Sequence, residues 1–364
     1  MKDVECWLTI FFASVLLLQV NYEIPEANAA SAKKPTTVAE IALYRGADRQ
    51  SLLEEGAKKE GTLTFYTAGT VPTLVLPTIK AFNKKYPDIK VEYYRADTNS
   101  LFTRVTQEHR SGNHVVDLVD TSAPFLYEGR KMMQAYYSPE MAGLEEGALK
   151  METGASNPYW GGHWESCIIL MYNTNKVPKA EAPKTNQDLL DPKWKGKMAI
   201  PSTSTGIYWI GNILTHLGEE FINKIVKQDI RVQKISGGAM GELVVSGEVP
   251  LTPATYTSNA SKSLAAGAPV GVSFVEPVGC TLHGVMLSQN APHPHAAMLF
   301  ADFTMSKAAA ESRAPAYSSP RKDMEGRGVS AAPFKKWYYT LVPDPIKTHK
   351  RWRQILVERF IEGR

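Results

Sequence analysis

The fold is decided by residues 63–119, LTFYTAGTVPTLVLPTIKAFNKKYPDIKVEYYRADTNSLFTRVTQEHRSGNHVVDLV, in which short apolar segments alternate with segments of helical periodicity. Strands are predicted at 63–67, 89–94 and 115–119. The segment between the first two strands places Val75, Ile79 and Phe82 on one face of a helix. Three strand–helix alternations within about sixty residues indicate an α/β fold with a parallel sheet.

The same alternation resumes farther along the chain. Further strands are predicted at 167–172, 197–200, 231–235, 249–253, 270–275 and 280–287, and helices after 206, near Pro294 and at 346–362. We interpret Gly161-Gly162 as a pause before this second set. A chain of 364 residues, 43% hydrophobic and 21% charged, suits two α/β lobes of roughly 150 residues each.

Composition and motifs argue against several functions. The chain has 41 basic and 37 acidic residues, and the basic residues form no dense stretch, so no nucleic-acid partner is predicted. No G-x-S-x-G, H-E-x-x-H, P-loop or G-x-G-x-x-G motif occurs, so we predict no catalytic residue, no cofactor and no enzyme activity. We interpret His293-Pro294-His295 as the start of a helix rather than a metal site. A disulfide between Cys167 and Cys280 is possible in an exported protein, but we predict that these cysteines do not pair.

The first 29 residues resemble a secretory signal. Trp7 to Val20 is an apolar run of 14 residues, shorter than the ~20 that a membrane-spanning helix needs. Ala27-Asn28-Ala29 has the small residues that a signal peptidase recognises, so cleavage is predicted after Ala29. An uncleaved anchor is the alternative. For a bacterial protein, cleavage predicts a soluble product in the periplasm.

Small hydroxyl residues follow three predicted strands, in loops 66–70, 120–124 and 202–206. Ligands of open α/β sheets gather at the carboxyl ends of the strands. Helix N-termini there offer free backbone N–H groups and a partial positive charge, which suit an anion. The alternative is that Ser and Thr act only as helix N-caps. Three such loops in two lobes favour a ligand cleft.

Several long segments together resemble the ferric-iron-type branch of the substrate-binding proteins of bacterial ABC transporters. They are YRGADR at 44–49, EGAKKEG at 55–61, DLLDPKWKGK at 188–197, GAPV at 267–270 and APHPHAAMLF at 291–300. The resemblance implies a type 2 periplasmic binding fold, with a ligand cleft between two lobes that close on the ligand. It implies a first lobe at 30–166, a second at 167–279 and a return to the first at 280–364. The crossover strands would be 167–172 and 280–287. The partners implied are a small solute or ion and the permease and ATPase of a transporter, with the protein itself a monomer.

The ligand implied by the resemblance depends on a few positions. Iron-binding members use two adjacent tyrosines, often with a histidine and a carboxylate. Here Tyr256 is followed by threonine, and Ala68-Gly69 and Thr121-Ser122 stand where the histidine and the acid would be. Ser204-Thr205-Gly206 matches the loop that holds an anion on a helix N-terminus. The ligand-binding residues predicted from the loops and the resemblance are Thr67, Ala68, Gly69, Thr70, Thr121, Ser122, Ser204, Thr205, Gly206 and Tyr256.

Two alternatives to an anion receptor stay open. Ferric iron is a hard cation that prefers several anionic oxygens, and Tyr66, Tyr127 or Glu276 could add them to Tyr256. An enzyme or sensor on the same fold is the second alternative, because a fold does not fix a function.

Overall fold

The computed structural model describes residues 34–145, 147–151, 157–314, 317–324, 335–339 and 344–363. The predicted signal peptide lies outside the described residues. Residues 36–364 form one unit, which contains both lobes. Among the described residues, no helix combines the length and the apolar character needed to cross a membrane.

The first lobe contains the predicted strand–helix alternation. Its elements are α1 (Val38–Leu43), α2 (Arg49–Glu60), β1 (Thr62–Thr67), α3 (Leu76–Lys85), β2 (Lys90–Arg95), α4 (Thr98–Ser111), β3 (Leu118–Thr121), β4 (Met133–Gln134), β5 (Leu149–Met151), α8 (Pro294–Met305) and α9 (Lys307–Arg313). Strand β1 is parallel to both β2 and β3. Helix α8 begins at Pro294 with His293 as its N-cap, as predicted. The Phe65 ring of β1 packs edge-on against Phe300 of α8, with ring centroids 5.3 Å apart. The carboxyl ends of β1, β2 and β3 therefore meet at one edge of the sheet.

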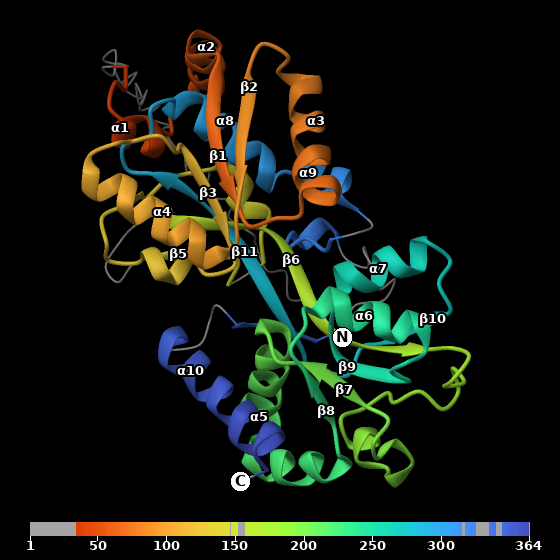
Figure 1. The fold of residues 1–364 in the computed structure, drawn as a ribbon. Coiled ribbons are helices and arrows are strands. Elements are labelled where there is room, and N and C mark those ends of the chain that lie inside the picture. The colour runs from red at the N-terminus through yellow and green to blue at the C-terminus, as the bar shows by residue number, and fades with distance from the viewer. Residues whose placement is uncertain are drawn as a thin grey trace, which may run out of the picture. The chain divides into compact units, whose positions relative to one another are not determined.

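Two long antiparallel strands, β6 (Pro158–Asn173) and β11 (Val278–Ser288), are the predicted crossovers (Figure 1). Strand β11 is antiparallel to β3, so the sheet is mixed rather than wholly parallel. The predicted pause at Gly161-Gly162 is wrong, because β6 runs straight through these residues. A side chain on Gly161 would overlap the Met305 sulfur, and one on Gly162 would press on Leu282. These glycines therefore allow close packing instead of ending a strand.

The prediction that the two cysteines stay unpaired is also wrong. Cys167 of β6 and Cys280 of β11 are directly opposed in the antiparallel register and form a disulfide. Both residues are fully buried. The sequence could not show this pairing, because 113 residues separate the two cysteines and only the strand register brings them together.

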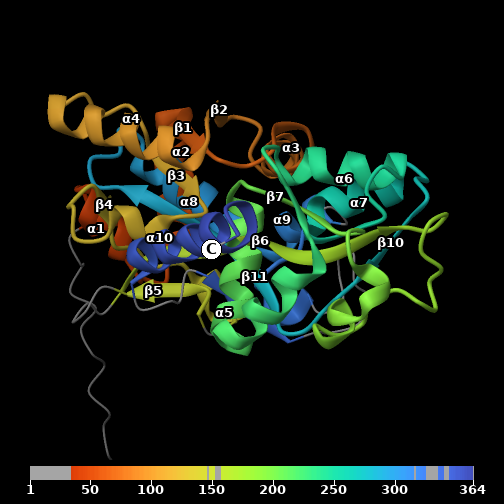
Figure 2. The ribbon, with the colours of Figure 1, turned by 60° about the horizontal axis from the view of Figure 1, so that its bottom comes forward.

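In the second lobe, helices lie on both faces of the strands that pair with β6. Its elements are β7 (Ala199–Pro201), α5 (Ser204–Ile225), β8 (Arg231–Gln233), α6 (Gly237–Ser246), β9 (Leu251–Tyr256), α7 (Thr257–Ala265) and β10 (Val270–Ser273). Strands β9 and β10 pair with the second half of β6. Figure 2 shows α6 and α7 on one side of these strands and α5 on the other. Alternate residues of β6 accordingly enter two cores, with Ile169 and Met171 in one and Ile168 and Leu170 in the other.

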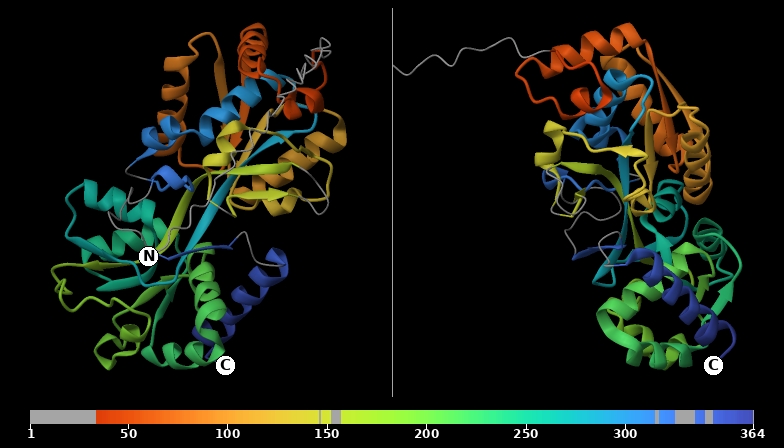
Figure 3. Two further views of the ribbon diagram at one scale, coloured as in Figure 1. Left: turned by 180° about the vertical axis from the view of Figure 1, so that it is seen from behind. Right: turned by 90° about the vertical axis from the view of Figure 1, so that its left-hand side faces the viewer.

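The chain returns to the first lobe through α8 and α9, as predicted, but its last helix, α10 (Pro345–Ile355), does not. Strand β12 (Lys336–Tyr338) pairs with β11, but helix α10 packs on α5 of the second lobe, as Figures 1 and 3 both show. The Trp352 indole of α10 lies against Gly211 of α5, where a larger residue would overlap the ring. Trp352, Ile355 and Leu356 are buried in the core of that lobe. The apolar side of α10 is therefore buried against the second lobe rather than the first.

Candidate functional site

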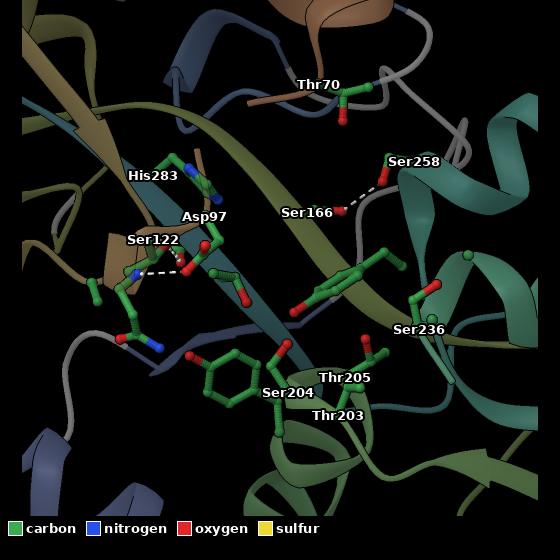
Figure 4. A pocket seen from close by; sticks show the side chains of 18 of the residues that line it. Thr70, Asp97, Ser122, Ser166, Thr203, Ser204, Thr205, Ser236, Ser258 and His283 are labelled. Atoms are coloured by element: carbon green, nitrogen blue, oxygen red, sulfur yellow. Dashed lines mark hydrogen bonds between the residues drawn. The ribbon is translucent and has the colours of Figure 1, made fainter. Parts of the chain in front are cut away.

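A cavity of about 750 Å³ is lined by residues of both lobes (Figure 4). Twelve lining residues are Ser, Thr or Asn, whose hydroxyl or amide groups can hydrogen-bond a polar ligand: Thr70, Thr98, Asn99, Ser122, Ser166, Thr203, Ser204, Thr205, Ser236, Ser258, Asn259 and Thr281. Three tyrosines, Tyr208, Tyr256 and Tyr317, also line it. The charged lining residues, Arg95 and Asp97, come from the end of β2 and the start of α4.

The N-termini of four helices, α4, α5, α6 and α7, contribute to this lining. Two of them are capped by a side chain. Asp97 accepts hydrogen bonds from the backbone N–H groups of Asn99 and Ser100 at 3.0 and 3.1 Å. Ser236 accepts one from Ala239 at 3.1 Å. The hydroxyl of Ser100 also donates to Asp97 and, together with the backbone bonds, lowers the pKa of that carboxyl. Asp97 is therefore ionised, but its charge is directed at its own helix.

Within the part of the chain that the structure describes, no side chain caps helix α5 or α7. The N-cap residue of α5 is Thr203, whose hydroxyl donates to the carbonyl oxygen of Ile235 at 3.2 Å instead of accepting from the helix. The N-cap residue of α7 is Tyr256, whose side chain likewise makes no capping hydrogen bond. An uncapped helix N-terminus carries unsatisfied N–H donors and about half a positive charge. Two such termini at one cavity favour a ligand with negatively charged oxygens.

The phenol of Tyr256 lies among hydroxyl groups of the cavity. Burial raises the pKa of Tyr256, while the hydroxyls of Thr281, Ser204 and Thr205 lower it by a smaller amount. Burial, reinforced by nearby Tyr256, also raises the pKa of Tyr208. Both phenols are therefore neutral at pH 7 and act as hydrogen-bond donors rather than as anionic metal ligands.

A buried network under the cavity orients His283. The His283 ring stacks on Trp164, with centroids 3.5 Å apart, and both side chains line the cavity. Nδ1 of His283 lies 3.2 Å from a carboxylate oxygen of Asp120, and Nε2 of His163 lies 3.0 Å from the same oxygen. Thr67 donates to the other oxygen at 2.5 Å. Because Nδ1 of His283 faces Asp120, Nε2 is the atom that remains for a ligand.

Burial and charge act against each other in this network. Asp120 and His163 are both buried. Burial alone would raise the pKa of Asp120, but His163 and His283 outweigh it and hold that pKa well below its usual range. Burial lowers the pKa of His163 despite the attraction of Asp120. Asp120 is therefore a fixed anion that positions the imidazole rings.

The structure brings half of the predicted site residues together. The residues that line the cavity are Thr70, Ser122, Ser204, Thr205 and Tyr256. The predicted residues outside the lining are Thr67, Ala68, Gly69, Thr121 and Gly206. Thr67 and Thr121 are fully buried, and Gly206 fits tightly against the Pro201 carbonyl oxygen.

Other lining residues were not predicted. Asp97-Thr98-Asn99 and Ser236-Gly237-Gly238 follow β2 and β8, so the rule of hydroxyl residues after a strand could have found them. Trp164 and His283 lie within long buried strands and carry no such signal. The oxygen donors suggested for an iron site, Tyr66, Tyr127 and Glu276, are outside the lining, and Tyr66 donates to Glu108 at 2.7 Å.

Within the described ranges, no group of three or more His, Cys, Asp or Glu side chains is arranged to hold a metal ion. Oxygen donors for a metal could still come from the three cavity tyrosines, Tyr208, Tyr256 and Tyr317.

Comparisons with known proteins agree with this architecture. The family model described as "Bacterial extracellular solute-binding protein" matches residues 78–331. Iron uptake protein A1 of Synechocystis sp. is 28% identical over 240 residues, which are 61% of this chain and 65% of that protein. The chain thus spans slightly less than two thirds of the length of this relative.

Solved structures share the fold. Iron-bound HitA from Pseudomonas aeruginosa superposes with a TM-score of 0.64 at 20% identity, covering 82% of this chain and 98% of its own. The periplasmic binding protein AfuA from Actinobacillus pleuropneumoniae, solved with fructose-6-phosphate bound, gives a TM-score of 0.61 at 20% identity, covering 83% and 99%. At these identities the likeness establishes the two-lobed fold alone.

Proposed function

The chain belongs to the bacterial extracellular solute-binding proteins, and from this membership we propose that it captures a small anionic solute for an ABC transporter. The solute class is a phosphorylated or carboxylated organic compound or an oxyanion. The protein, cleaved after Ala29, would act in the periplasm as a monomer. It would deliver the solute to a membrane permease and its ATPase.

The observation that carries this proposal is the pair of uncapped helix N-termini at the cavity. The first turns of α5 and α7 present backbone N–H donors to which, among the described residues, no capping side chain is bonded, and Ser204, Ser258 and Tyr256 place hydroxyl groups beside them. Charge-assisted hydrogen bonds from such donors to phosphate or carboxylate oxygens are about twice as strong as neutral ones. The arrangement therefore discriminates in favour of an anion over a neutral solute of the same size.

A binding protein of this kind needs no nucleophile or general base. Its ligand has to bind one arrangement of the lobes more tightly than the other, since a ligand shifts an equilibrium only by its difference in affinity. The cavity supports such a role because α4 comes from the first lobe and α5, α6 and α7 from the second. One bound anion could therefore contact both lobes at once.

Ferric iron is the second candidate, and two observations favour it. Three tyrosines line the cavity, and one relative carries the name of an iron uptake protein. Ferric iron would require the phenols to ionise, whereas burial raises the pKa of Tyr256 and Tyr208. The carboxylate of Asp97 is already engaged by the N-terminus of α4. These features favour the anion.

Native mass spectrometry of the protein purified from its host tests the proposal. We expect a co-purified organic anion or oxyanion whose mass is lost on denaturation. The same preparation should be exchanged into phosphate-free buffer and titrated with inorganic phosphate, citrate and a hexose phosphate. Co-purified iron without an anion, or a neutral ligand, would overturn the proposal.

A further inference from the structure

Helix α10 contributes side chains to the cavity although it lies outside the part of the chain that matches the family. The match ends at residue 331, and α10 begins at Pro345. Ile346 and His349 of this helix line the cavity. The family likeness therefore assigns no role to this part of the lining.

The position of α10 is fixed by its buried side. Trp352 is 4% exposed and fits against Gly211 of α5, and its ring lies 5.9 Å from that of Tyr339. Ile355 and Leu356 are buried in the same core. A helix anchored by three buried side chains presents the residues of its preceding turns at defined positions.

Ile346 and His349 lie six and three residues before Trp352, on successive turns of one side of the helix. The His349 ring contacts the ring of Tyr208, another lining residue, with centroids 5.5 Å apart. Ile346 is 58% exposed, so this large apolar side chain is not part of the core. A ligand in the cavity would therefore bury apolar surface of Ile346 that is exposed to water without it.

We propose that α10 is a specificity element of this site, in which Ile346 and His349 contact the part of an organic anion beyond its charged group. This inference rests on the proposed function, because the charged group would be bound at the N-termini of α5 and α7. Ile346 offers an apolar contact. His349, whose pKa is lowered by burial and by Arg353, is neutral at pH 7 and offers one donor and one acceptor. The ligand class is accordingly an organic phosphate or carboxylate with a body larger than a bare oxyanion.

Calorimetric titration of the full-length mature protein tests this assignment with four probes: inorganic phosphate, sulfate, citrate and fructose 6-phosphate. The variants are Ile346→Ala, Ile346→Trp and His349→Phe. The last of these keeps a ring against Tyr208 but removes the two ring nitrogens of the histidine. Gln354→Ala is the matched control, because Gln354 is an exposed neutral residue of α10 outside the cavity lining.

We expect the wild type to bind at least one organic probe. Each cavity variant should weaken that binding about five- to twentyfold, while changing the binding of any inorganic probe less than twofold. The control should match the wild type, and all variants should retain its apo melting temperature. Unchanged organic affinity in the cavity variants, or a wild type that binds inorganic anions alone, would overturn the role of α10 and leave the anion site standing. A wild type that binds none of the four probes would overturn the proposed function as well.

Discussion

A carboxylate introduced at the start of α5 should compete directly with the ligand. Ser204 is the first residue of that helix, is exposed and lines the cavity. In the variant Ser204→Asp the new charge would lie beside the proposed position of the anion. Two like charges about 4 Å apart repel by about 1 kcal/mol in water and about 4 kcal/mol near a protein surface. Since residue 204 is exposed, the lower half of this range applies, and we expect about 10-fold weaker binding.

The same substitution should stabilise the protein without ligand. Thr203 leaves the N-terminus of α5 without a side-chain cap. A negative charge in the first turn of a helix typically contributes 0.3–1 kcal/mol through the helix dipole. The apo melting temperature should therefore rise while affinity falls. A damaged fold would lower both the melting temperature and the affinity. A higher melting temperature together with a lower affinity therefore identifies a competing charge.

Isothermal titration with the co-purified anion and scanning calorimetry of the apo protein measure the two effects. Ser204→Asn is the matched control, because it has the same shape without the charge and should retain most of the affinity. Binding that is unchanged or tighter in Ser204→Asp would show that the ligand carries no negative charge at the N-terminus of α5. Tighter binding of iron in this variant would favour the ferric site, since the aspartate would add an anionic oxygen.

Tyr256→Phe should cost about 0.5–1.5 kcal/mol of ligand binding by calorimetry, and more if the lost bond is to a charged oxygen. Ferric citrate should produce no visible tyrosinate charge-transfer band, and a strong band that Tyr256→Phe abolishes would contradict the anion site. Replacing Cys167 and Cys280 by serine should lower the free energy of unfolding in urea by about 4–5 kcal/mol, because the disulfide closes a separation of 113 residues; an unchanged midpoint would contradict this. Stability should fall as the pH drops below about 6.5, because His163 has a lowered pKa and binds its proton more readily in the unfolded chain. Asp120, whose pKa is also held low, adds a loss of the same sign at lower pH. Melting temperatures between about pH 8 and pH 5 measure this, and His163→Gln should flatten the curve; an equally steep curve in that variant would assign the titration to other groups.

Local signals in the sequence predicted the fold well. The spacing of Val75, Ile79 and Phe82 and the apolar strands on either side depend on neighbouring residues, so the alternation of strands and helices could be inferred directly. Small hydroxyl residues after a strand located Ser204 and Ser122, because in each lobe the ligand side of the sheet lies at the carboxyl ends of its parallel strands.

Features that depend on distant parts of the chain were missed. The register of β6 against β11 determines the disulfide, and it also places His283 beside Trp164. The packing of Trp352 on Gly211 places α10 at the cavity. None of these contacts leaves a pattern within a short window of sequence, because each depends on side chains separated by more than 100 residues.

A crystal structure of the protein with its co-purified ligand, with anomalous scattering recorded at the iron edge, would distinguish an anion from ferric iron in the cavity. We expect an anionic group within hydrogen-bond distance of the backbone N–H groups in the first turns of α5 and α7, with no iron signal. A metal ion coordinated by the phenol oxygens of Tyr256 and Tyr208, or a ligand bound away from these helix termini, would contradict it.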